Sequence, residues 1–366
     1  MPRRYIFLMA SESSPIRGRG TALNPANRFE RLHVEPDAEV CQTEKDERPH
    51  RTVYYKDATS TVLTRNDSPD IGFEFSINPY RGCEHGCIYC YARPTHEYLG
   101  FSAGLDFESK IIVKENAPEL LRRELSSPKW KPQVVAMSGV TDCYQPVERQ
   151  LKITRRCLEV FAEFRNPVGI VTKNQLITRD VDLLAELARH NAVSVYISVT
   201  TQDSELARVM EPRTSMPQAR LQAIRELSAA GVPVNVMVAP VIPGLTDHEM
   251  PSILKSAAEA GARSAGYVVL RLPYAVKDLF AQWLETHFPN RKDSVLNRIR
   301  ALRGGELNSA EFGSRMSGEG LFAEQIARTF EVASRKFNLL RRGPELSVAA
   351  FRRPPGPQLD LFAPTP

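Results

Sequence analysis

The chain has 366 residues, of which 42% are hydrophobic and 25% are charged, an ordinary balance for a globular protein. This length accommodates one large α/β domain of about 200 to 250 residues with extensions at its ends. No run approaches the ~18 consecutive apolar residues of a membrane helix, and the first apolar stretch is shorter than the ~7 to 15 residues of a secretion signal, so we expect a cytoplasmic protein that does not enter membranes.

The N-terminal region is predicted to be an arm rather than a folded domain. Residues 1–70 are rich in Arg, Asp, Glu, Pro and Thr and show little hydrophobic periodicity. We therefore expect them to pack on the core or to stay partly mobile, and we expect the core to span residues 71–290.

Three of the six cysteines lie in the stretch 78–91, which reads NPYRGCEHGCIYCY. Their C-x3-C-x2-C spacing can bring three thiolates to one centre, whereas a closed structural zinc site normally takes four ligands. On a [4Fe-4S] cluster, three thiolates leave one iron open to an outside ligand. A zinc site that recruits His85 or His96 is the alternative, and disulfides fit poorly because one thiol would stay unpaired and the cytosol is reducing. The predicted cluster ligands are Cys83, Cys87 and Cys90.

Six apolar, strand-like runs follow one another along the core and alternate with helical patterns. The runs span residues 73–77, 133–139, 167–174, 193–201, 232–244 and 265–273. Helical patterns follow at residues 148–164, 179–190, 217–230, 248–260 and 276–287. Such alternation predicts parallel βαβ units that are buried on both faces. The expected fold is therefore α/β, a partial (β/α)6 TIM-like barrel with its chemistry at the C-terminal ends of the strands.

Two further helices, at residues 292–302 and 319–342, are predicted to form a small cap within residues 291–353. The apolar stripe of the second helix is predicted to consist of Leu321, Ile326, Phe330, Phe337 and Leu340. Residues 291–353 carry 13 basic and 7 acidic side chains. Because the net charge of the whole chain is +5, the remaining residues are about neutral. This basic stretch either meets a nucleic-acid backbone or is a solvated helical face.

The cysteine motif and its surroundings resemble a known family. The string NPYRGC-x-HGC-x-YCYAR, residues 78–93, is similar to the cluster loop of the radical S-adenosylmethionine (AdoMet) enzymes, and especially to a bacterial branch close to the spore photoproduct lyases. The resemblance implies that the open iron binds the amino and carboxylate groups of AdoMet. An electron, from a donor such as flavodoxin or ferredoxin, then splits AdoMet into methionine and a 5′-deoxyadenosyl radical.

The resemblance also implies AdoMet-binding roles for residues at the strand ends. It places Lys173 on the AdoMet carboxylate, Ser198 and Thr200 on the ribose, and Tyr89 against the adenine. The implied AdoMet-binding residues are Tyr89, Ser138, Asp142, Lys173, Ser198, Thr200, Arg213 and Leu272. A polar residue at such a position can instead cap a loop, because strand-end residues in these barrels are not always functional.

The guanidiniums of Arg213 and Arg271 are expected at the same end of the barrel as these strand-end residues, where they could bind a carboxylate or a phosphate in bidentate fashion. Arg213 could equally pair with Glu211 and hold its own loop. The sequence leaves both interpretations of Arg213 open.

In the photoproduct lyases, two tyrosines around the last cluster cysteine and a nearby thiol are implicated in returning a hydrogen atom. Tyr89 and Tyr91 match the tyrosine pair, and Cys143 is the candidate thiol. Cys143 follows Asp142, whereas the family's cysteine precedes this element, and Gly139 stands at about the expected place. We predict that Tyr91 and Cys143 are catalytic, with a different substrate as an open alternative.

The last residues, 354–366, read PPGPQLDLFAPTP and are predicted to be a flexible, semi-extended tail. Within this tail, a pentapeptide resembles the motif by which bacterial replication and repair proteins bind the DNA sliding clamp. It consists of Gln358, Leu359, Asp360, Leu361 and Phe362. The leading hypothesis is a photoproduct-lyase-like enzyme acting on DNA. The alternatives are radical modification of RNA or protein, and a non-catalytic iron–sulfur protein that docks on DNA.

Overall fold

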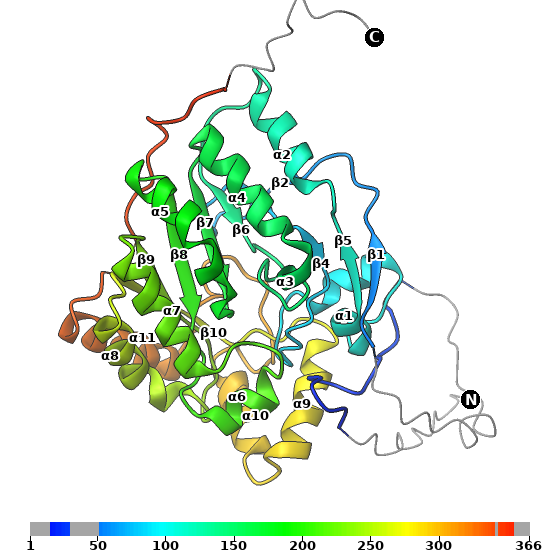
Figure 1. Ribbon diagram of the computed structural model, residues 1–366. Coiled ribbons are helices and arrows are strands. Elements are labelled where there is room, and N and C mark those ends of the chain that lie inside the picture. Colours follow the sequence, from blue (N-terminus) through cyan, green and yellow to red (C-terminus); the bar gives the residue numbers. More distant parts are fainter. Residues whose placement is uncertain (1–14, 30–50, 341–342, 355–366) are drawn as a thin grey trace, which may run out of the picture.

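The computed structural model describes residues 15–29, 51–340 and 343–354 (Figure 1). Its main sheet has seven strands in the order β10-β9-β8-β7-β6-β3-β2. Neighbouring strands are parallel, except that β2 is antiparallel to β3. The strands are β2 Leu63–Arg65, β3 Phe75–Ile77, β6 Val135–Met137, β7 Val168–Thr172, β8 Val193–Ser198, β9 Val234–Val241 and β10 Ser264–Val269. Each of the six predicted runs overlaps one of the parallel strands, so the α/β barrel prediction is confirmed.

Helices follow the parallel strands and pack against the sheet (Figure 1). The matching helices are α4 Ile153–Phe164, α5 Val181–Arg189, α7 Pro217–Ala229, α8 Met250–Glu259 and α9 Val276–His287. The central strands are built largely from buried Val and Ile, because both faces of a parallel sheet must be covered. Among the described residues the two edge strands, β2 and β10, do not pair with each other, so the barrel is open on one side.

A second, three-stranded sheet has no counterpart among the predicted elements. It consists of β1 Val53–Lys56, β5 Lys110–Val113 and β4 Tyr80–Arg81, in that order. Four helical elements of the described ranges also lie outside the predicted set: η1 Arg93–Leu99, α1 Leu105–Ser109, α2 Ala117–Ser126 and α6 Ser204–Met210. Two short 3-10 helices, η2 Gln175–Asp180 and η3 Asp247–Glu249, overlap the starts of the helices predicted at 179–190 and 248–260. The predicted helix at 148–164 is broken, because Lys152 adopts a left-handed conformation with φ of 52° between α3 Glu148–Leu151 and α4.

Residues 15–29 of the predicted arm lie against the core near the cysteine motif. The amide of Leu105 donates to the carbonyl of Leu23 at 2.8 Å. The amide of Gly20 donates to the carboxylate of the buried Glu108, also at 2.8 Å. The described part of the arm thus packs on the core, and it contributes β1 and β2 to the two sheets.

The two C-terminal helices pack on different parts of the barrel. Helix α10 Lys292–Ala301 lies against α9, and α11 Leu321–Lys336 lies against α8. In α11, Ile326 and Phe330 are buried as predicted. Leu321 and Leu340 are 83% and 63% exposed, so the prediction for these two is wrong. Leu321 is the first residue of the helix and Leu340 lies beyond its end, so neither extends the buried stripe.

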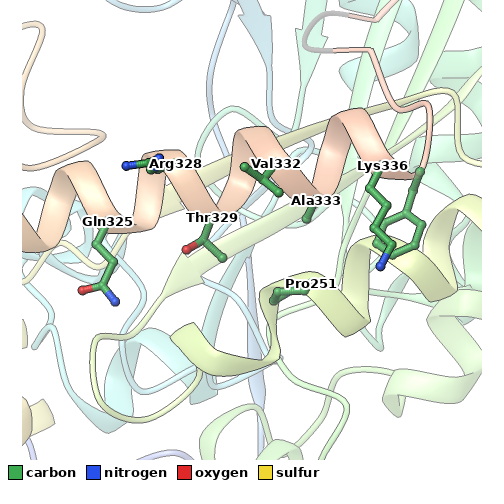
Figure 2. Close-up of a pocket in the computed structure, with 8 residues that line it drawn as sticks. Pro251, Gln325, Arg328, Thr329, Val332, Ala333 and Lys336 are labelled. Atoms are coloured by element: carbon green, nitrogen blue, oxygen red, sulfur yellow. The ribbon is translucent and has the colours of Figure 1, made fainter.

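A pocket of about 460 Å³ lies between α8 and α11 (Figure 2). Its lining includes the apolar side chains of Pro251 in α8, Val332 in α11 and Phe337 just after α11, together with the charged Arg328 and Lys336. The pocket is formed by the helices that cover the sheet rather than by the loops at the strand ends. None of the helices in the described ranges has the length and apolar character needed to span a bilayer.

Candidate active site

The three cysteines of the motif lie on one compact loop after β4. Cys83 and Cys87 are buried, Cys90 is partly exposed, and all three are free thiols. Gly82 and Gly86 have left-handed backbones, with φ of 79° and 67°, which lets the loop turn tightly around a small centre. Burial, a neighbouring carboxylate and the other two thiols raise the pKa of Cys83. Cys90 packs against the apolar cluster that contains Cys83 and also against the one that contains Cys87.

A buried arginine, Arg93, holds this loop from the inside. Its guanidinium donates to the carbonyls of Cys87 at 3.0 Å, Gly86 at 3.2 Å and Gly104 at 2.9 Å. It also pairs with the equally buried Glu108. Because a guanidinium presents its donors in a fixed plane, it fixes the directions of these carbonyls. Arg93 closes the motif string, yet no role was predicted for it.

Of the two histidines near the loop, His85 has a partner for each ring nitrogen, whereas both ring nitrogens of His96 are buried without a hydrogen-bond partner among the described residues. His85 lies 3.1 Å from the amide of Asn174 through Nε2 and 3.3 Å from Asp142 through Nδ1. His96 packs against the ring of Phe107, and burial lowers its pKa to about 4. Across the described ranges, no three His, Cys, Asp or Glu side chains are placed to hold a single metal ion. Three neighbouring thiols fit a [4Fe-4S] cluster, in which each cysteine ligates a different iron.

Asp142 ties the loop after β6 to the end of β7 and to the cysteine loop. Its carboxylate accepts hydrogen bonds from the Thr172 hydroxyl and the Lys173 amide, both at 2.8 Å, and faces His85. Burial alone would raise the pKa of Asp142, but His85 and the backbone donors hold this pKa below its ordinary value. The oxygens of Asp142 are thus used within the protein, where they fix the loops expected to bind AdoMet.

Lys173 brings a positive charge to the cysteine loop. Its Nζ donates to the carbonyl of Ala239 at 3.2 Å and lies 5.9 Å from the centre of the Tyr89 ring. Burial raises the pKa of Cys87 and Cys90, and the charge of Lys173 opposes this effect. A partly exposed ammonium at this place suits the carboxylate of a bound ligand.

Tyr89, Glu211 and Arg220 form a buried network behind the cysteine loop. The Tyr89 hydroxyl donates to Glu211, and Glu211 pairs with Arg220. Thr200 also donates to Glu211, at 2.8 Å, and Arg220 donates to the carbonyl of Ser198 at 3.1 Å. Burial alone would raise the pKa of Glu211, but its cationic neighbours, Arg220 first, hold it below the ordinary value. Glu211 and Arg220, which were not among the predicted site residues, thus link three that were: Tyr89, Ser198 and Thr200.

Arg213 pairs with Glu84, at 3.1 Å, and not with Glu211. Glu84 is buried in the cysteine loop and also accepts a hydrogen bond from the Tyr54 hydroxyl at 3.1 Å. The alternative prediction that Arg213 holds its loop to Glu211 is wrong, because Arg220 occupies that carboxylate. Arg213 instead joins the segment after α6 to the cysteine loop.

The two predicted catalytic residues lie in different environments. Tyr91 is 48% exposed, donates to the carbonyl of Gly139 at 2.7 Å and lies under the guanidinium of Arg271, 5.7 Å from its ring centre. Cys143 has no exposed surface and packs in the main apolar core. Of the two side chains, only that of Tyr91 is therefore accessible from outside the protein.

Ser138 and Leu272 complete the predicted set. Ser138 has a left-handed backbone, with φ of 71°, and its hydroxyl accepts a hydrogen bond from the Cys143 amide at 2.8 Å. Leu272 is fully buried in the apolar cluster that also contains Cys87 and Tyr89. Leu272 thus supports the cysteine loop through packing.

Gly20 contacts the cysteine loop where there is no room for a side chain. A Cβ atom at this position would lie 1.9 Å from the carbonyl oxygen of Gly86. We expect Gly20→Ala to displace residues 15–29, to lower the free energy of unfolding by about 1–3 kcal/mol, and to reduce the iron bound after anaerobic reconstitution. The matched control is Gly169→Ala in β7, where a Cβ atom would have no neighbour within 4 Å. Equal iron content in the two variants would contradict the supporting role of Gly20.

Comparisons with known proteins agree with this geometry. The model of the Radical SAM superfamily matches residues 77–257. An uncharacterized protein of Mycobacterium tuberculosis (strain ATCC 25618 / H37Rv) is 41% identical over 232 residues, which cover 63% of this chain and 67% of that protein. The spore photoproduct lyase of Geobacillus sp. (strain Y412MC61) is 25% identical over 200 residues, covering 51% of this chain and 53% of the lyase.

The fold is also similar to a solved structure of spore photoproduct lyase complexed with dinucleoside spore photoproduct. The TM-score is 0.57 at 16% identity, with 78% of this chain and 79% of the other covered. The residues that match the superfamily include all three motif cysteines and the strands from β4 to β9. The chain therefore belongs to the radical SAM superfamily, whose members use a [4Fe-4S] cluster and AdoMet.

Proposed function

We propose that this enzyme cleaves AdoMet reductively in the cytosol, with flavodoxin or ferredoxin as electron donor, and repairs DNA in the manner of a photoproduct lyase. Cys83, Cys87 and Cys90 would hold the cluster, which supplies a 5′-deoxyadenosyl radical when it is reduced with AdoMet bound. Lys173 binds the AdoMet carboxylate, since its ammonium lies beside the cysteine loop and is partly exposed. Tyr89, held by Glu211, lines the adenosine side.

The position of Tyr91 carries this proposal. Tyr91 directly follows the last cysteine of the motif, is 48% exposed, and has its phenol oriented by the carbonyl of Gly139. A phenol held there gives the hydrogen atom of its O–H bond to a carbon radical on the substrate, so that a C–H bond forms as the O–H bond breaks and a phenoxyl radical is left on Tyr91. One electron from the proposed flavodoxin or ferredoxin donor and one proton from water then restore the phenol. Cys143 is fully buried. We therefore assign hydrogen return to Tyr91 and only a packing role to Cys143.

The test compares Tyr91→Phe with wild type after anaerobic reconstitution with iron and sulfide. With dithionite and AdoMet, we expect 5′-deoxyadenosine formation within about 2-fold of wild type, while repaired product from irradiated duplex DNA falls by at least ~10-fold. Tyr98→Phe is the matched control, because Tyr98 is 73% exposed and packs on Phe29 instead. Wild-type protein that forms no 5′-deoxyadenosine, or that turns over RNA or protein but not DNA, would refute the proposed function.

We also propose that Gln358–Phe362 binds the bacterial sliding clamp. This pentapeptide lies outside the described residues, and the proposal rests on its sequence pattern alone. Leu361 and Phe362 would fill an apolar pocket while Gln358 hydrogen-bonds at the rim. Deleting residues 358–362 should abolish clamp binding without changing AdoMet cleavage, whereas deleting residues 363–366 should preserve both. Unchanged clamp affinity after the first deletion would exclude this role.

A further inference from the structure

The connection between α10 and α11, residues 303–320, is anchored to the mouth of the barrel. The amide of Val269, the last residue of β10, donates to the carbonyl of Met316 at 2.8 Å. Arg303 donates to the carbonyls of Leu270 at 2.9 Å and Ser314 at 3.1 Å. The connection is therefore attached to the C-terminal end of β10, next to the proposed reaction centre (orange trace in Figure 1). It also lies beyond residues 77–257, the part of the chain that matches the superfamily.

A bidentate ion pair holds this connection to the opposite edge of the open sheet. Arg315 donates to both carboxylate oxygens of Asp70, at 2.6 Å through Nε and also through Nη2. Asp70 lies between β2 and β3, at the sheet edge that does not pair with β10 in the described structure. The guanidinium of Arg315 also lies 4.6 Å from the ring centre of Phe312. The pair thereby orients an aromatic ring that is 58% exposed.

Arg271 is a cation without a carboxylate partner in the described part of the chain. Its Nη1 lies 3.6 Å from the sulfur of Met316, its Nε is buried without a hydrogen-bond partner, and its guanidinium covers Tyr91. Burial and the charge of Arg315 lower the pKa of Arg271. The nearby carboxylate of Asp70 is already bound to Arg315. Arg271 thus places a positive charge beside Tyr91 that an anionic ligand would neutralise.

We propose that Arg271 and Phe312 form a nucleic-acid-binding lip, in which Arg271 binds a phosphodiester oxygen and Phe312 stacks on an unstacked base beside Tyr91. This inference rests on the proposed function and names the contacts that would bring the nucleic acid to it. Guanidinium groups make strong, directional hydrogen bonds to phosphate oxygens. Exposed aromatic rings next to cations are the usual platform for bases of single strands. Arg315 has a positioning role, because its own charge is paired with Asp70.

The test is anaerobic fluorescence anisotropy on the reconstituted protein with AdoMet and a short, labelled single-stranded DNA. We expect Phe312→Ala to raise Kd by ~5- to 50-fold with an unchanged salt slope, because it removes stacking only. We expect Arg271→Gln to raise Kd by about 10-fold and to reduce the salt slope by about 0.7, because one phosphate contact is lost. A neutral methylphosphonate at the contacted linkage should abolish the difference between Arg271→Gln and wild type.

Matched controls keep this test specific. Phe29→Ala removes another exposed ring, at 55% exposure, and Arg335→Gln removes an exposed arginine of α11. Both should bind like wild type. If Phe312→Ala or Arg271→Gln bound the DNA with wild-type affinity, the proposed role of these two residues in nucleic-acid binding would be wrong. The same conclusion would follow if an acidic peptide competed through Arg271 while Phe312→Ala bound DNA normally. AdoMet cleavage by the wild-type protein, measured without DNA, separates the two proposals. Absence of cleavage would refute the proposed function, whereas the DNA affinities of the variants decide whether Arg271 and Phe312 bind nucleic acid.

Discussion

Cys87→Ala is expected to lose the [4Fe-4S] cluster and, with it, AdoMet cleavage down to the level of iron-free protein. Cys87 is one of only three motif thiols, so its loss leaves two ligands where the cluster needs three. Bound iron should fall from about four per protein to near zero. Iron analysis, the visible absorption of the cluster and 5′-deoxyadenosine formation would each report this loss.

Cys157→Ala is the matched control, because Cys157 is also a fully buried free thiol but lies in α4 within the main core. Its replacement should lower the free energy of unfolding by about 1–2 kcal/mol through lost packing, while iron content and AdoMet cleavage stay at wild-type levels. If Cys87→Ala retained a full cluster, or Cys157→Ala lost it, the ligand assignment would be wrong.

Arg220→Met is expected to lower the free energy of unfolding of the iron-free protein by about 3–5 kcal/mol, because it leaves the charge of Glu211 buried and unpaired. Both partners of this ion pair are almost completely buried, at 1% and 2% exposure. The double variant Glu211→Gln/Arg220→Met should recover more than half of the loss, since it removes the charge but keeps an oxygen that accepts the Tyr89 hydroxyl. Urea unfolding at neutral pH measures both changes.

The pH dependence of this effect follows from the lowered pKa of Glu211. A carboxylate with a lowered pKa stabilises the fold above its ordinary value of 4.5, and the contribution is lost as the pH falls through its folded value. The difference between wild type and Arg220→Met should therefore shrink on acidification. Arg335→Met breaks an exposed pair on α11 and should cost less than ~0.5 kcal/mol. A comparable loss in both variants would contradict the importance of burial.

The six parallel strands were predictable because each falls in a short apolar run, and these runs alternate with helical patterns along the chain. The three-stranded sheet was not, because β4 has two residues and β1 pairs with a strand more than fifty positions away in the chain. Hydrophobic periodicity carries no information about such pairings. The broken helix at Lys152 escaped notice for a related reason, since lysine gives no sign of a left-handed conformation.

The three cysteines proposed as cluster ligands stand out by their spacing in the sequence, but the charged residues around them do not. Arg220 did leave a signal, because it falls on the buried face of α7 together with Ala223, Ile224 and Leu227. An arginine at an apolar position of a helix needs a buried partner. Nothing in the sequence identifies Glu211 as that partner, and the same holds for Arg93 and its contacts. Such pairs are chosen by the three-dimensional fold.

The ion pair between Arg315 and Asp70 has a consequence for how the wall of the barrel is held together. In a fully hydrogen-bonded barrel, backbone hydrogen bonds join every pair of neighbouring strands. Here a side-chain ion pair links the segment between β2 and β3 to the connection that is attached to the end of β10. The distance between these two edges can therefore change when one ion pair breaks, while every strand pairing of the sheet stays intact.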